Sequence, residues 1–257
     1  MGETTGRAGV GALAGVRTGD IVTLRCSPRE AVVAEASAQY VTVQWPWNAI
    51  DPNSLMQWNG LRDIPRTPEA PDWDIEPFQV VSPSDAIERH GVCEVGIPET
   101  VAYVIHVAEF PEPLDVGWLP RPRTYVSLMA HGVPVPPFAE EIGFTLDPDG
   151  DEPIESELIY RPYAFLVDGD EVADSEGRMW RFSVPWNWTA FDDSPGEYPV
   201  WPLQLIWRDG GQDPQAAEAV ARATSSGAHG DEIARWLARA GLDDAPQLPP
   251  SVLAEDL

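Results

Sequence analysis

Two histidines and a glutamate are the residues whose types could support acid–base or metal chemistry in this chain. His106 and Glu109 fall in the apolar segment Val101–Phe110, and His131 directly follows a second strand-like segment that ends at Ala130. If these two strands are neighbours, the side chains offer two imidazoles and a carboxylate, which suit zinc or iron. No His-x-His or His-x-x-x-His spacing accompanies them, so we expect neither a metal nor a cofactor. His106, Glu109 and His131 remain the acid–base groups of an alternative, enzymatic interpretation.

The other reactive groups match no established catalytic pattern. Cys26 and Cys93 have no Cys-x-x-Cys spacing, and the spacing of His90 and Cys93 is too loose to indicate a nucleophile–base pair. The sequence contains no Gly-x-Ser-x-Gly or Gly-x-Gly-x-x-Gly motif. All 16 basic residues are arginines, which excludes Schiff-base chemistry and standard P-loop or kinase phosphoryl transfer. The acidic run 147–152 has the wrong register for an EF-hand, so we expect a solvated loop.

Tryptophan is abundant, with 11 in 257 residues, and several copies lie at two similar corners. The corners are Pro46-Trp47-Asn48 and Pro185-Trp186-Asn187, preceded by the turns Gly19-Asp20 and Gly169-Asp170. This likeness predicts a faint internal duplication. Tryptophan is enriched where proteins bind partners, so we predict a binding surface at the corners. Its residues are Trp45, Trp47, Asn48, Trp58, Trp186, Asn187, Trp188 and Trp201.

The formal net charge of −26 limits the partners that the chain could bind. Nucleic-acid binding depends on Lys and Arg that displace counterions, so no nucleic acid is expected, and anionic membrane surfaces are disfavoured. No apolar stretch approaches the ~20 residues of a membrane span, and the N-terminal residues lack the pattern of a signal peptide. We therefore expect a cytoplasmic bacterial protein and a basic protein partner, which the carboxylates would steer electrostatically.

The elements that must position these residues are predicted to be short strands. Proline occurs 27 times, and it is excluded from helix interiors and central strands. A short helix is expected from Ser82 or Ser84 to Gly91, and an acidic loop over Leu146–Glu157. The expected strands are Ile21–Arg25, Ala31–Ala36, Tyr40–Trp45, Val101–Phe110, Tyr125–Ala130, Ala164–Val167, Met179–Val184 and Leu203–Arg208.

Two amphipathic helices are predicted near the C-terminus. Asp213-Pro214 has the residue types of an N-cap and a first helical position, and Gly227 is the expected stop. The second helix is expected from near Asp231 to Gly241, with apolar residues at i, i+3, i+4 and i+7. The two segments are the predicted helical hairpin.

The predicted fold is an α+β protein, mostly β, in which short antiparallel strands form small barrel- or sandwich-like units. The predicted organisation is a flexible leader (1–17), a first β unit (18–68), a central β segment (69–150), a second β unit (151–212), the helical hairpin (213–242) and an acidic tail (243–257). For function, the sequence favours a non-catalytic acidic binding protein, such as an inhibitor or immunity-type protein. The alternative is an enzyme of specialised metabolism with an aromatic pocket.

Overall fold

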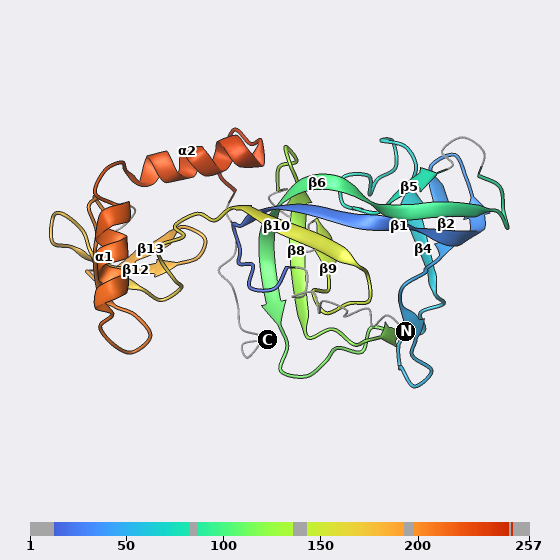
Figure 1. Ribbon diagram of the computed structural model, residues 1–257, viewed down its shortest axis with the longest axis horizontal. Helices are drawn as coiled ribbons and strands as arrows, with labels where there is room; N and C mark the ends of the chain where they lie inside the picture. Colours follow the sequence, from blue (N-terminus) through green and yellow to red (C-terminus); the bar gives the residue numbers. More distant parts are fainter. Residues whose placement is uncertain (1–12, 83–86, 136–142, 193–197, 247, 249–257) are drawn as a thin grey trace, which may run out of the picture.

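The computed structural model describes residues 13–82, 87–135, 143–192, 198–246 and 248. Strands account for 40% of the described residues and helices for 10%, and the sheets are antiparallel, which confirms the predicted mostly-β class. The first lobe, residues 21–160, is the larger and contains a half-barrel. The second lobe, residues 161–242, holds a small sheet and the two helices, with α2 extending towards the first lobe (Figure 1).

The first lobe is an eight-stranded sheet with a two-stranded ladder beside it. The sheet order is β4-β2-β1-β6-β8-β9, while β10 pairs with β1 and β5 pairs with β6. The strands of the sheet are β1 (Ile21–Ala36), β2 (Tyr40–Gln44), β4 (Leu61–Pro65), β5 (Gln79–Ser82), β6 (Val92–Glu109), β8 (Thr124–Ala130), β9 (Phe144–Leu146) and β10 (Ile154–Tyr160). The ladder joins β3 (Ala49–Ile50) to β7 (Trp118–Leu119).

Two long, bent strands, β1 and β6, hold the first lobe together (Figure 1). They pair along most of their lengths, with register shifts on both sides of Cys26. One half of the pair is flanked by β10 and β8, and the other by β2 and β5. At the bend, a Cβ on Gly96 would come within 2.7 Å of the Cys26 carbonyl oxygen, so only glycine allows this approach. Residues of the expected units 18–68 and 69–150 therefore share one sheet.

The second lobe contains a four-stranded sheet and two helices, of which α1 packs on β14 and α2 contacts β6 of the first lobe. The order is β13-β12-β11-β14, and the strands are β11 (Glu171–Ala173), β12 (Met179–Ser183), β13 (Asn187–Ala190) and β14 (Gln204–Trp207). α1 (Pro214–Ala223) begins as predicted, with the Asp213 carboxylate accepting from the backbone N–H groups of Gln215 and Ala216. α2 (His229–Ala240) ends at Gly241, whose φ of 74° is left-handed.

Two predicted strands are one element in the structure. Ile21–Arg25 and Ala31–Ala36 are both parts of β1, and the register with β6 skips Ser27 and Pro28 between them. A proline fits within a strand where the ladder is locally interrupted, because it has no N–H to donate. Pro28 therefore marks a bend and not the end of a strand.

Two further segments differ from their predictions. Ala164–Val167 is not a strand: residues 162–165 form a turn, in which Tyr163 has a positive φ of 49° and its carbonyl accepts from the Leu166 N–H. The acidic segment Leu146–Glu157 is only partly a loop, because β10 begins at Ile154. In β10 the Glu155 and Glu157 side chains are exposed while the backbone pairs with β1, so charge alone does not exclude a strand.

The helix predictions also need correction at their ends. Of the helix expected from Ser82 or Ser84, residues 83–86 lie outside the described residues, and 87–91 are not helical. α1 stops before Thr224, whose hydroxyl donates to the Val220 carbonyl and accepts from the Leu203 N–H. α2 begins two residues before Asp231, at His229.

The two Gly-Asp turns adopt the same hydrogen-bonded arrangement. The Asp20 carboxylate accepts from the Arg17 N–H at 2.9 Å and from the Arg161 guanidinium Nε at 2.9 Å. In the second lobe the Asp170 carboxylate accepts from the Val167 N–H at 2.9 Å and from the Arg208 Nε at 2.8 Å. Both carboxylates are fully buried. The Pro-Trp-Asn corners are less alike, because only the second has a cis peptide bond before its proline.

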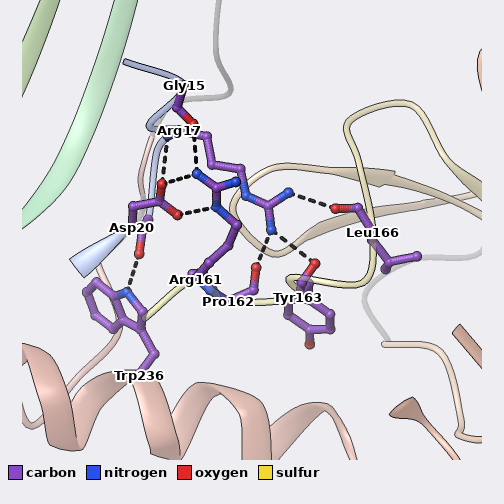
Figure 2. A network of polar contacts seen from close by, with 9 residues as sticks. Gly15, Arg17, Asp20, Arg161, Pro162, Tyr163, Leu166 and Trp236 are labelled. Carbon is purple, nitrogen blue, oxygen red and sulfur yellow. Dashed lines mark hydrogen bonds and ion pairs between the residues drawn. The ribbon is translucent and has the colours of Figure 1, made fainter. Parts of the chain in front are cut away.

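The first of these turns joins the two lobes (Figure 2). The Arg17 guanidinium donates to the carbonyl oxygens of Leu166, Tyr163 and Pro162. From α2, the Trp236 indole N–H donates to the Gly19 carbonyl at 2.7 Å. Burial lowers the pKa of Arg17 to about 10, which leaves it charged at neutral pH. Buried arginine contacts therefore fix the second lobe against the start of β1.

Candidate binding surface

The first Pro-Trp-Asn corner belongs to the core of the first lobe. Trp45 and Trp47 are buried, and their rings pack against each other and against Phe78. The Trp45 indole N–H donates to the Asn48 side-chain oxygen at 2.8 Å. The Arg62 guanidinium lies 4.4 Å from the centre of the Trp45 ring. This aromatic cluster therefore already holds a cation from the chain itself.

The second corner is divided between the core and a partly exposed cluster. Trp186 is buried and packs on an aromatic ring of α2, whereas Asn187 is exposed. Trp188 and Trp201 are half-buried and pack around Tyr163, with ring centres 5.8 and 6.5 Å from that of the tyrosine. Of the six tryptophans predicted to bind, three are thus buried and three, including Trp58, retain some exposure.

A buried tyrosine–histidine pair lies against this cluster. The Tyr163 hydroxyl hydrogen-bonds to Nδ1 of His229, and the exposed Tyr198 ring stacks on the imidazole with 3.5 Å between ring centres. Burial lowers the pKa of His229 to about 4 and raises the pKa of Tyr163. At neutral pH both groups are therefore uncharged, and they connect α2 to the chain after β10.

The three residues of the enzymatic interpretation lie apart. His106 is opposite Ser127 on β8, whereas the His131 N–H donates to the carbonyl of Val101, five residues away along β6. Glu109 lies three residues beyond His106 on the same strand, so the two side chains leave opposite faces. Among the described residues, no three His, Cys, Asp or Glu side chains are placed to hold a metal ion.

An exposed apolar surface lies beside the first corner, on the β3–β7 ladder and the turn after β3. This surface, the apolar tip, comprises Ile50, Leu55, Met56, Trp58, Trp118 and Leu119. The exposed fractions are 93% for Leu55, 54% for Met56, 52% for Ile50 and 38% for Leu119. The half-buried rings of Trp58 and Trp118 pack together with 5.4 Å between their centres. Ile50 and Trp118 are also opposed in the ladder, and exposed apolar side chains on adjoining segments are typical of interaction sites.

Two carboxylates fix the backbone of the apolar tip. Asp115 accepts from the Leu55 N–H at 2.9 Å and from the Ser54 hydroxyl. Asp51 accepts from Nε of Arg121 at 3.0 Å and from its Nη2 at 2.5 Å. These hydrogen bonds hold the pKa of both carboxyls below the usual range, so both are ionised at neutral pH. The exposed side chains are therefore carried by a backbone that is already ordered.

Of the six residues of the apolar tip, only Trp58 is predicted from the sequence. The signal that was present is the pair Leu55-Met56, two apolar residues in a turn of Ser, Asn and Gln. A turn has no hydrophobic period, however, and the carboxylate that orders this one comes from Asp115, 60 residues away along the chain. Only the fold brings the two segments together.

Comparison of the chain with family models, with curated proteins and with solved structures finds no match. In the part of the chain that the structure describes, neither helix has the length and apolar character needed to cross a membrane.

Proposed function

We propose that this chain is a non-catalytic binding protein that docks on a basic protein partner through the apolar tip. The observation that carries the proposal is the ordered exposure of Leu55 and its apolar neighbours. A folded protein gains little from holding a leucine 93% exposed on a hydrogen-bonded turn, because burial of that side chain would contribute about 1.5–3 kcal/mol. A partner that covers the Leu55 side chain gains this free energy on binding.

Pre-organisation strengthens this argument. Binding costs free energy when loops and side chains must be ordered, and a turn already held by Asp115 and by the Asp51–Arg121 pair avoids much of that cost. The base of the tip is formed by two indole rings, and tryptophan is the residue type most enriched among binding hot spots. Polar residues Asn53, Gln57 and Asn59 are exposed in the same turn, as in the rim of an interface.

Charge selects the class of partner. The chain carries −26, and the segments that frame the tip contribute three carboxylates (Asp51, Glu112 and Asp115) against Arg121. Such a field speeds the approach of a basic protein and repels acidic ones. An inhibitor or immunity-type protein that masks a basic enzyme or toxin is one form of this function, in bacterial cytoplasm as the sequence favours.

Site-specific photo-crosslinking tests the proposal. A photoreactive amino acid at position 55 is irradiated in the native host, and Leu158, which is 48% exposed on β10, receives the same replacement as a control. We expect position 55 alone to crosslink a protein of pI above about 9. That purified partner should bind L55S/M56S at least about 30-fold more weakly than wild type, and L158S about as tightly. The absence of a specific crosslink, or an affinity of the partner for L55S/M56S equal to that for wild type, would reject the tip as the docking site.

A further inference from the structure

Two glutamates face each other on the outer surface of the first lobe. Glu30 of β1 and Glu94 of β6 are Cα partners in the antiparallel ladder, and both are exposed. Side chains of directly opposed residues stand on the same face, about 5 Å apart at Cβ, where like charges are unfavourable. Neither carboxylate takes part in an ion pair within the described residues.

The nearest arginines are directed elsewhere. Arg29 precedes Glu30 in the same strand, so its side chain starts from the opposite face. Arg89 donates from Nε to the carbonyl of Ala34 at 3.1 Å, and Ala34 lies beyond the last paired residues of β1 and β6. The two opposed carboxylates are therefore not neutralised by the arginines that lie closest in the chain.

Exposed valines adjoin the two glutamates on the same face. Val32 and Val92 are also Cα partners, one step along the ladder from Glu30 and Glu94, and they are 46% and 54% exposed. An aliphatic pair beside an acidic pair matches the two parts of a lysine or arginine side chain, an apolar stem and a cationic head. The guanidinium of arginine, with five donors, can also bridge two carboxylates.

We propose that this strip, composed of Glu30, Val32, Val92 and Glu94, binds an arginine side chain of the basic partner. The inference rests on the proposed function and assigns a second contact to it, on the sheet face of β1 and β6. The stem packs on the valines, and the guanidinium lies between the two carboxylates and relieves their repulsion. In the free protein the repulsion between the opposed glutamates lowers the free energy of unfolding. In the complex the same two carboxylates increase the affinity for the arginine.

Titration with hexa-arginine tests the strip without the partner. Methyl signals of ¹³C-labelled valines are followed by NMR at about 0.15 M salt, where the Debye length is about 8 Å. We expect the signals of Val32 and Val92 to shift saturably and more than that of Val200, which is equally exposed in the second lobe. E30Q/E94Q should weaken binding about tenfold. E99Q/E157Q, which removes the same charge from other exposed positions, should weaken it less than about twofold.

Two results would overturn the inference: uniform shifts over all exposed valines, or equal weakening by the two double variants. Thermal unfolding provides a second test, because a purely structural role of the two glutamates predicts the opposite change in melting temperature. E30Q/E94Q should melt at or above the wild-type temperature, because it removes a repulsion, and a lower melting temperature counts against the strip. If hexa-arginine binds here while position 55 crosslinks nothing, the strip stands and the proposed function fails. If position 55 crosslinks a basic protein but hexa-arginine does not bind at the strip, the proposed function stands and the strip is rejected.

Discussion

The Asp20→Asn substitution removes one charge from the joint between the lobes with almost no change in side-chain size. The native carboxylate is fully buried and accepts from the Arg17 N–H and from Nε and Nη2 of Arg161. In the variant, the Arg161 guanidinium, whose side chain is 28% exposed, faces an amide that accepts hydrogen bonds but offers no counter-charge. Arg17 and Arg161 lie close enough for their positive charges to repel, and in the variant Arg17 also lacks compensation from the Asp20 charge.

The expected loss in the free energy of unfolding is about 3 kcal/mol. Breaking a buried ion pair from one side costs about 3–5 kcal/mol, and the partial exposure of Arg161 places this pair at the lower end. The matched control is Glu155→Gln, which breaks the Arg25–Glu155 pair, where both side chains are more than half exposed. That loss should be much smaller, because an exposed ion pair contributes little to stability.

Urea unfolding followed by tryptophan fluorescence measures both variants. With a slope of about 3 kcal/mol per molar urea, Asp20→Asn should lower the midpoint by about 1 M, and Glu155→Gln by much less. Equal midpoint shifts for the two variants would show that burial gives the Asp20–Arg161 pair no added role.

Three other outcomes are expected. Because the folded pKa of His229 is about 4 and the ordinary value is 6.5, only the unfolded state gains a proton as the pH falls from 6.5 to 4. Stability should therefore drop over that window by roughly 2–3 kcal/mol more in wild type than in His229→Gln, as measured by urea unfolding at each pH. Gly117→Ala should lower the melting temperature more than Gly210→Ala: both have positive φ, but only at Gly117 would the new Cβ lie 2.9 Å from a side chain. Arg62→Gln should cost about 3 kcal/mol in urea unfolding because it leaves Glu76 buried and unpaired, and adding Glu76→Gln should restore part of that loss.

Local signals in the sequence predicted the elements that local interactions determine. Asp213-Pro214 begins α1, and Gly241 ends α2, because capping depends on residues within one turn of the helix. The alternation in Tyr40–Trp45 predicted β2 (Tyr40–Gln44), where Val41 and Val43 are buried. The strand predicted at Ala164–Val167 failed because a short apolar run has no period that distinguishes a strand from a buried turn.

Long-range relations could not be obtained in the same way. Trp45 and Trp58 are both tryptophans near the first corner, yet one is buried beneath Arg62 and the other forms the base of an exposed surface. Their difference depends on which segment covers each ring, and residue type does not encode that. The opposition of Glu30 and Glu94 likewise follows from the register of two strands more than 60 residues apart in the chain.

The use of arginine connects the fold with the proposed function. Four arginines pair with carboxylates that have little or no exposure: Asp20, Asp51, Asp170 and Glu232. Arginines that pair with buried carboxylates do not neutralise the surface, so most of the −26 charge remains on exposed acidic residues. The arginine–carboxylate pairs that fix the joint between the lobes and the apolar tip therefore leave the surface negatively charged. A basic partner meets both the ordered apolar tip and an electrostatic field that favours its approach.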